Sequence, residues 1–277
     1  MNELQAPRAR AAGGAWMMRW AGASAVALAA FLALPLLSLL LRAAPSRLAA
    51  ELTQPAVLQA LALSLATSVC ATLVVVALGM PVAYLLATRS FAGKRALEAL
   101  IDLPMVLPPT VAGFALLMAF GRSGLAGGAL HLFGISLPFT TPGVVVAQVF
   151  MAAPFFIAPA RAGFASVDRG LLDAAATLRA REAFAFRHVM LPLSRRPLVA
   201  GAAMAGARAL GEFGATITFA GNLPGRTQTM PLAVYMALQS DLDAAIVLSV
   251  LLLVMSLGLL FGLRAASSAP PRRGARA

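Results

Sequence analysis

Arg208 and Glu212 carry opposite charges and stand four residues apart in an apolar part of the chain. At 1.5 Å per helical residue they would lie about 16 and 22 Å beyond Pro197, near the centre of a membrane-spanning helix. Isolated charges are costly at that depth, so we expect the two side chains to pair inside a helix bundle or a water-filled cavity. The pair could be structural or could contact a passing ion. For an anion the structural role is favoured, because a carboxylate repels it.

Prolines and small residues place further polar groups at membrane depth. Pro108 and Pro109 lack backbone donors and free earlier carbonyl groups, which predicts a broken or kinked helix. Thr110 follows this break, while Gly214 and Thr216 follow the charged pair. Hydroxyl groups can donate hydrogen bonds to a passing ion, so the two threonines are candidate ion contacts. A static kink that serves only packing would explain the prolines equally well.

No group of residues has the spacing of a catalytic or metal site. The string Gly-Arg-Ser-Gly at 121–124 suggests an intramembrane serine protease, but Ser123 would lie on the opposite side of the membrane from His188. His131 and His188 have no second ligand at metal spacing. The only lysine, Lys94, is not followed by serine or threonine, which excludes a nucleotide-binding P-loop. We therefore predict no catalytic residue, metal or bound cofactor in this chain.

The elements that position these residues follow from hydropathy. Of 277 residues, 60% are hydrophobic and 12% are charged, and the mean hydropathy is +0.86, which indicates a membrane protein. A helix needs about 20 apolar residues to cross a hydrocarbon core of roughly 30 Å, which predicts an all-α integral membrane fold with six spans. They cover residues 17–41, 60–88, 99–120, 141–164, 197–220 and 244–264. The first is longer than a signal-peptide core and is kept as a span.

The arginines predict the orientation of the chain. The net charge is +12, but the basic residues lie between apolar runs without stacking aromatics, so no nucleic-acid partner is expected. Most of them lie in the two tails and in the second and fourth connections, which places both termini in the cytoplasm. The predicted organisation is a cytoplasmic tail over 1–16, a transmembrane domain over 17–264 with a cytoplasmic loop at about 165–196, and a basic tail over 265–277.

The longest predicted cytoplasmic segment, at about 161–197, has helical character. Four residues recur there at helical spacing, namely Leu171, Ala175, Leu178 and Glu182. Asp173 is placed near the start of the helix, where a carboxylate suits the helix dipole. An amphipathic helix on the membrane surface is an alternative interpretation of the same pattern.

The sequence DAAATLRAREAFAFRHVMLP, from Asp173 to Pro192, resembles the cytoplasmic EAA loop that defines the permeases of ABC importers. The resemblance implies a coupling helix that seats in a groove on an ATP-binding subunit. The residues assigned to this contact are Asp173, Ala174, Ala175, Ala176, Leu178, Arg179 and Pro192. Asp173 replaces the usual glutamate of the family and Arg179 its usual glycine. The second departure affects the turn, because arginine adopts a positive φ less readily than glycine.

Two further strings narrow the resemblance. DLPMVLPPTVAGFALLMAFGRSG at 102–124 and LGEFGATITFAGNLPGRTQTMPLAVY at 210–235 are similar to molybdate permeases, with sulfate and thiosulfate permeases as close relatives. The resemblance covers about residues 61–263 and implies the MetI-like, type I fold of ABC importer permeases. The GEFGATITF and NLPG strings favour molybdate over sulfate, whereas tungstate is not separated from molybdate.

The resemblance implies a transporter subunit of a bacterial inner membrane rather than an enzyme. Its implied partners are a second copy of the chain, two ATP-binding cassette subunits that hold ATP and magnesium, a periplasmic oxyanion-binding protein and the lipid bilayer. The pathway candidates are then Pro108, Pro109, Thr110, Arg208, Glu212, Gly214 and Thr216. A secondary transporter is an alternative, but it would need ion-coupling groups in its spans, and neither a clear internal repeat nor a chain of acidic residues is present.

Overall fold

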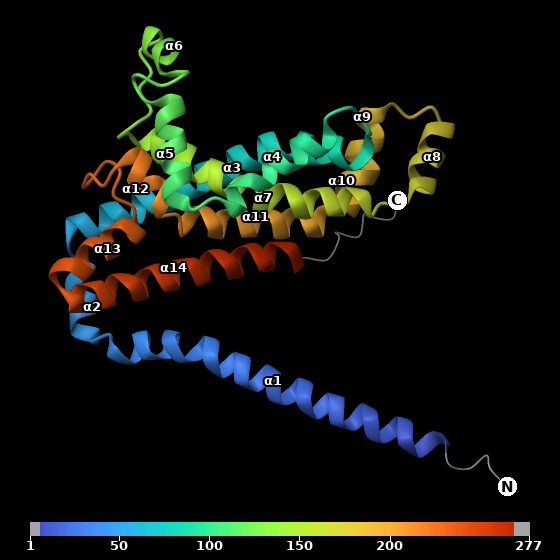
Figure 1. Ribbon diagram of the computed structural model, residues 1–277, viewed down its shortest axis with the longest axis horizontal. Helices are drawn as coiled ribbons and strands as arrows, with labels where there is room; N and C mark the ends of the chain where they lie inside the picture. The colour runs from blue at the N-terminus through green and yellow to red at the C-terminus, as the bar shows by residue number, and fades with distance from the viewer. Residues whose placement is uncertain (1–5, 269–277) are drawn as a thin grey trace, which may run out of the picture.

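The computed structural model describes residues 6–268, and within them every regular element is helical (Figure 1). The elements in chain order are α1 (Ala6–Arg42), α2 (Pro45–Glu51), α3 (Pro55–Thr88), α4 (Lys94–Val106), α5 (Pro109–Phe120), α6 (Gly127–Leu132), α7 (Thr141–Ala165), α8 (Arg169–Thr177), α9 (Glu182–Ala185), the π-helix η1 (Phe186–Met190), α10 (Leu191–Leu193), α11 (Arg195–Leu210), α12 (Gly214–Ala220), α13 (Met230–Ser240) and α14 (Leu242–Ser268). The predicted all-α class is confirmed.

Four helices, α1, α3, α7 and α14, are long and apolar enough to cross a membrane. They correspond to four of the predicted spans, although α1 already begins at Ala6 and α3 at Pro55. The segments predicted at 99–120 and 197–220 each consist of two shorter helices, α4 with α5 and α11 with α12. The bundle therefore combines continuous helices with two broken ones.

Each break has a local cause. Leu107 is extended and Pro109 begins α5, so the proline pair supplies no N–H groups to continue α4. This confirms the break predicted from the prolines. In the other segment, α11 ends at Leu210 and the carboxylate of Glu212 accepts a hydrogen bond from the Ala215 N–H in the first turn of α12. The segment at 197–220 was predicted as one span, and the local cap at its acidic residue divides it.

The centre of the bundle is formed by α3, α7 and α11, which lie side by side (Figure 1). Buried alanines line the contacts between these three helices. They are Ala71, Ala83, Ala152, Ala160, Ala205 and Ala209. Small side chains let helix backbones approach closely, which is the main route to helix association inside a bilayer.

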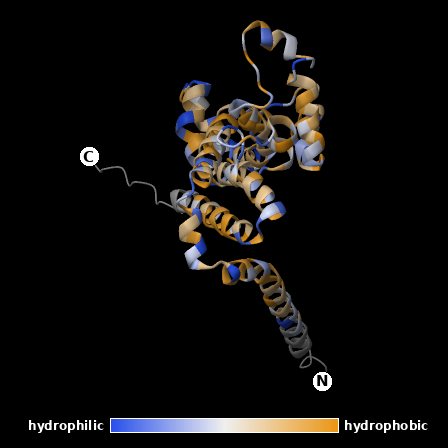
Figure 2. Ribbon diagram, turned by 90° about the vertical axis from the view of Figure 1, so that its left-hand side faces the viewer, coloured by the Kyte–Doolittle hydropathy of each residue, from blue (hydrophilic) through white to orange (hydrophobic). Residues whose placement is uncertain are grey.

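The first helix, α1, diverges from the rest of the bundle (Figure 1). None of its membrane-length part is buried. The part of α1 that is coloured in Figure 2 consists mostly of hydrophobic residues, and Phe31 and Leu41 are 73% and 85% exposed. Apolar surface of this extent needs lipid or another protein around it.

The segment from α8 to α10 lies at one end of the bundle. The start of α1 and the end of α14 point toward the same side, at the right of Figure 1. At the opposite end lie α2, α12 and α13, and α6 projects from that end beyond α5 (Figure 1). The segment predicted to be helical at 161–197 contains α8, α9, η1 and α10, with a turn between α8 and α9. Its helical character is therefore confirmed.

Candidate functional site

The two short helices that follow the breaks, α5 and α12, pack against each other. A β-carbon on Gly113 would lie 2.6 Å from the carbonyl oxygen of Ala215. A β-carbon on Gly214 would lie 2.6 Å from the Cβ of Pro109 and 3.2 Å from the Thr110 nitrogen. Only glycine permits contacts this close without movement of a backbone. The crossing thus brings Pro109, Thr110 and Gly214 together from two distant parts of the sequence.

The two threonines proposed as ion contacts have different surroundings. Thr110 is exposed, together with its neighbours Pro108 and Pro109. Thr216 is fully buried, and its hydroxyl has no hydrogen-bond partner within the described residues. Thr110 can therefore be reached from outside this bundle, whereas Thr216 can be reached only if α12 moves.

The predicted pair between Arg208 and Glu212 is confirmed. Arg208 Nη1 lies 2.5 Å from Glu212 Oε2, in the geometry of an ion pair rather than a hydrogen bond. The Glu212 side chain is 1% exposed and that of Arg208 is 23% exposed. The other oxygen, Oε1, accepts a hydrogen bond from the Ala215 N–H at 2.8 Å. One carboxylate therefore both neutralises Arg208 and caps α12, while part of the Arg208 side chain remains exposed.

Gln148 is a buried polar residue of α7 that was not singled out from the sequence. Its side chain is 1% exposed, and its Oε1 has no partner within residues 6–268. Its neighbour Ala147 packs in a cluster with Ala112 and Ala215, from the two crossing helices. In the sequence, a single amide side chain inside an apolar run was the feature that could have indicated this buried polar residue.

The helix α8 carries an apolar face that no described residue covers. Leu171 and Ala174 of α8 and Leu178, the residue directly after it, have the spacing of one helix side, and all three are exposed, Leu178 to 83%. Asp173 is also exposed and Ala175 is half-buried, while Pro192 lies further along, in α10. Ala176 lies within α8. Most of the residues assigned to subunit contact are thus on one short helix at the end of the bundle.

The predicted position of Asp173 near the start of this helix is wrong. α8 begins at Arg169, and Asp173 lies in its middle. Asp168 precedes the helix instead, and its Oδ1 accepts a hydrogen bond from the Gly170 N–H at 2.9 Å. Aspartate is favoured before a helix because its side chain satisfies a free N–H group. Asp173 is thereby left free of a capping role.

The end of α8 explains the departure at Arg179. This residue has φ 57°, in the left-handed region. The Ala180 N–H donates to the Ala175 carbonyl at 3.0 Å, which is the bond that closes a Schellman turn. Glycine is usual at this position, and another residue there costs about 1–2 kcal/mol. Arg179 therefore keeps the expected turn at an energetic cost.

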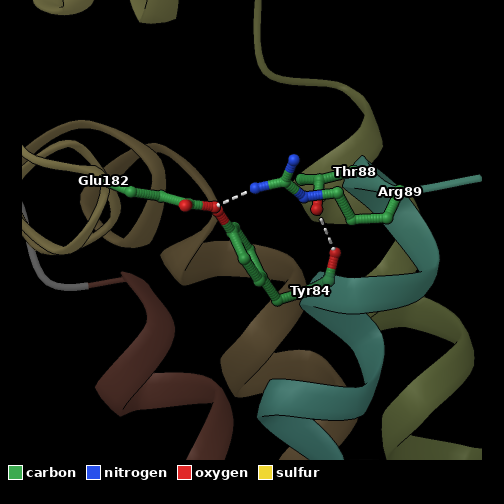
Figure 3. A network of polar contacts seen from close by, with 4 residues as sticks. All are labelled: Tyr84, Thr88, Arg89 and Glu182. Atoms are coloured by element: carbon green, nitrogen blue, oxygen red, sulfur yellow. Dashed lines mark hydrogen bonds and ion pairs between the residues drawn. The ribbon is translucent and has the colours of Figure 1, made fainter.

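Beyond this turn, Glu182 contacts the end of α3 (Figure 3). Its Oε1 accepts hydrogen bonds from the Tyr84 hydroxyl and from Arg89 Nη2, both at 2.8 Å. The hydrogen bond from Tyr84, followed by the hydrogen bond and charge of Arg89, holds the pKa of Glu182 below its ordinary value of 4.5. The partners lie too far apart in sequence for spacing to have predicted this network.

The residues considered for other chemistry have ordinary contacts. His188 Nδ1 lies 3.1 Å from the Phe184 carbonyl and its ring stacks on Phe184. His131 lines a small cavity of about 170 Å³ with Arg122 and Ser136. Neither histidine has a described contact with Ser123. Within the part of the chain that the structure describes, no group of three His, Cys, Asp or Glu side chains is placed to hold a metal ion.

Known proteins are similar to this chain in sequence and in fold. Residues 78–270 match the family described as binding-protein-dependent transport system inner membrane component. The molybdenum transport system permease protein ModB of Mycobacterium tuberculosis is 42% identical over 247 residues, which cover 89% of this chain and 94% of that protein.

Two solved structures show the fold. One chain of a bacterial alginate ABC transporter, solved in complex with an alginate pentasaccharide-bound periplasmic protein, has a TM-score of 0.74 at 14% identity and covers 91% of this chain and 94% of its own. A chain of the MetNI methionine ABC transporter has a TM-score of 0.62 at 18% identity, and the match covers 76% of this chain and 94% of that one. The fold is therefore that of ABC importer permeases, as expected. The chain belongs to the family of inner membrane components of binding-protein-dependent transport systems, whose members are permease subunits rather than enzymes.

Proposed function

We propose that this chain is the membrane-spanning permease of an ATP-driven importer of molybdate. The supporting observation is the 42% identity to a molybdenum transport permease across 94% of that protein. Tungstate is the alternative closest in chemistry, followed by sulfate and thiosulfate. All are tetrahedral oxyanions that hydrogen-bond donors and moderate positive potential would attract.

The proposed energy source is a pair of ATP-binding cassette subunits, which hold ATP and magnesium. The chain itself has no P-loop, and the exposed apolar face of α8 is a suitable surface for a partner. The residues proposed for this contact are Asp173, Ala174, Ala175, Ala176, Leu178, Arg179 and Pro192. The segment from α8 to α10 leads directly into α11, so a force applied at α8 would reach the Arg208–Glu212 pair at the far end of α11.

The proposed pathway lies between two copies of the chain related by a twofold axis. In one copy, Pro108, Pro109 and Thr110 are exposed, as is α1 along its apolar length. An apolar hollow of about 830 Å³ also opens between α3, α5 and α7, with Val74, Leu116 and Val146 among its lining residues. A second copy would cover part of this surface and supply the other half of the pathway.

In this proposal the anion arrives from a periplasmic oxyanion-binding protein and crosses as the two copies alternately open to each side. The residues proposed to border its path are Pro108, Pro109, Thr110, Arg208, Glu212, Gly214 and Thr216. Arg208 would provide positive potential, and its pairing with Glu212 would keep the anion from binding too tightly to leave. The unpartnered hydroxyl of Thr216 would become available when the α5–α12 crossing opens.

The proposed orientation in the bacterial inner membrane places both termini in the cytoplasm. The start of α1, the end of α14 and the arginine-rich segment around α8 all point toward one side (Figure 1), which supports this arrangement. The proposed organisation keeps a cytoplasmic tail at 1–16, a permease domain at 17–264 with its coupling loop at about 165–196, and a basic tail at 265–277. The tail region at 1–16 already includes the beginning of α1.

Copurification tests the partner. The chain is expected to copurify with an ATP-binding cassette subunit, in a mass that corresponds to two copies of each. Asp173→Arg and Leu178→Asp should abolish this binding, because Asp173 is exposed on α8 and Leu178 is exposed directly after it. Leu132→Asp is the matched control, since Leu132 is 87% exposed but lies in α6 at the opposite end. Unchanged binding in both α8 variants would remove the coupling assignment.

Stimulation of ATP hydrolysis tests the substrate. In vesicles that contain the complex and its binding protein, molybdate should stimulate hydrolysis at lower concentration than sulfate, with tungstate compared in parallel. Preferential stimulation by sulfate would instead support the sulfate alternative. Ser123→Ala should leave uptake unchanged, and a peptide-cleaving activity lost with this replacement would favour the protease. Uptake that follows a proton gradient without the ATPase would favour a secondary transporter.

A further inference from the structure

Glu182 connects the loop after α8 to the membrane helix α3 through a single carboxylate oxygen. Its Oε1 receives hydrogen bonds from Tyr84 and Arg89, at 2.8 Å each (Figure 3). Tyr84 lies in the last turns of α3, and Arg89 is the residue that follows this helix. The donors therefore belong to one spanning helix and the acceptor to the segment that carries α8.

The chain reaches this contact directly from α8. It leaves the helix through the left-handed turn at Arg179 and enters α9 at Glu182. α8 packs against α9, and Leu172 adds an apolar contact from α8 to the core of the bundle. A displacement of α8 would thus meet the bundle at Leu172 and Glu182 before it follows the chain through η1 and α10 to α11.

Aromatic neighbours hold the Tyr84 hydroxyl in position. The centroid of the Tyr84 ring lies 5.1 Å from that of Phe186 and 6.1 Å from that of Phe164, and both pairs meet edge to face. Hollows of about 290 and 280 Å³ lie beside this contact, and both are lined by Tyr84, Glu182 and Phe186. The α9 segment therefore rests on α3 through a narrow set of side chains with open space beside it.

Stability is a weak explanation for the network. The side chains of Arg89 and Glu182 are 59% and 61% exposed. Exposed ion pairs contribute little to folding, because water solvates the separated charges almost as well. The location of the contact, between the proposed docking helix and a spanning helix, indicates a mechanical role instead.

We propose that Tyr84, Arg89 and Glu182 form a strut that transmits the displacement of α8 to α3. The three are positioning residues that set how much anion is imported for each ATP hydrolysed. The inference rests on the proposed function, in which α8 seats on an ATPase subunit. Without the strut, α8 would still bind the ATPase and move α11 along the chain, but α3 would follow incompletely.

The test measures imported molybdate per ATP hydrolysed in vesicles that contain the full complex. Tyr84→Phe removes only the hydroxyl, and Arg89→Glu places two carboxylates together. Both variants should bind the ATPase normally and hydrolyse ATP, while the import ratio falls by about fivefold or more for Arg89→Glu. The exchange Arg89→Glu with Glu182→Arg should restore at least part of the ratio. Thr88→Ala is the matched control, because Thr88 bonds only to the Tyr84 carbonyl in this network (Figure 3).

The outcomes separate this inference from the proposed function. An unchanged import ratio in Tyr84→Phe and Arg89→Glu overturns the strut, even if the complex is fully active. Loss of ATPase binding in both variants also overturns it, since the contacts would then serve folding or docking. A wild-type complex that imports none of the oxyanions argues against the proposed function instead.

Discussion

Gly113 of α5 faces the backbone of Ala215 in α12 so closely that an added β-carbon would lie 2.6 Å from the Ala215 carbonyl oxygen. This contact and its counterpart at Gly214 hold together the two helices that follow the breaks. The candidate pathway therefore depends on two glycines in helices that are far apart in the sequence.

Gly113→Ala should separate α5 from α12. Added volume in a packed contact costs about 1–3 kcal/mol, so the midpoint of thermal unfolding in detergent should fall and uptake should decrease. Gly128→Ala is the control, because nothing lies within 4 Å of a β-carbon at Gly128. Equal behaviour of the two variants would show that the α5–α12 crossing differs from the one described.

Glu212→Gln should destabilise the bundle by leaving Arg208 without its counter-charge. The amide oxygen of glutamine can still accept the Ala215 N–H, so the helix cap is kept and the loss of charge is isolated. Removing one partner of a fully buried pair costs about 3 kcal/mol or more, and the cost should be smaller here because the Arg208 side chain is 23% exposed. The double replacement Arg208→Gln with Glu212→Gln should recover most of the unfolding midpoint. A single variant as stable as the wild type would mean that the pair contributes nothing.

Arg179→Gly should stabilise the turn after α8. Glycine adopts the left-handed conformation without the steric cost that arginine carries, and we expect a gain of about 1 kcal/mol. Hydrogen exchange of the Ala180 amide, which bonds to the Ala175 carbonyl, should slow. Arg181→Gly is the control, since Arg181 has φ −65° and gains nothing from glycine. Faster exchange in Arg179→Gly would contradict the strained turn.

The contact at Glu182 should weaken only in acid. The neighbouring donors lower the pKa of this carboxyl from its ordinary value of 4.5, so the folded state favours the ionised form. Its contribution is therefore complete above 4.5 and is lost as the pH falls through the lowered pKa. Hydrogen exchange over α9, corrected for intrinsic rates, should differ between wild type and Glu182→Gln near neutral pH and converge only below about 4.5. Convergence already near pH 6 would contradict the assigned contact.

Local chemistry explains which features could be predicted from the sequence. Pro108 and Pro109 predict a helix break, because proline lacks a backbone donor in any context. The pairing of Arg208 with Glu212 could be predicted because charges at membrane depth need partners. A spacing of four residues on a helix brings the two side chains together. Arg179 was noted only through the resemblance to the permease family, whose loop has glycine at that position, and the positive φ of Arg179 agrees with that turn.

The features that were missed depend on tertiary structure. Glu182 meets Tyr84 and Arg89 only because α9 folds back onto the end of α3, and exposed charges have many possible partners. The second break arises because Glu212 caps α12, whereas hydropathy alone predicts a continuous span over 197–220. Asp173 was placed at a helix start because Asp168, the residue that caps α8, was not considered as the boundary.

Uptake by purified protein tests the central claim most directly. Vesicles that contain this chain with its ATP-binding cassette subunits and binding protein should accumulate molybdate when ATP is supplied to the side that carries α8. Vesicles that contain the chain alone should accumulate none, because the chain has no site that converts energy. Accumulation by the chain alone, or by the complex without ATP, would contradict the account.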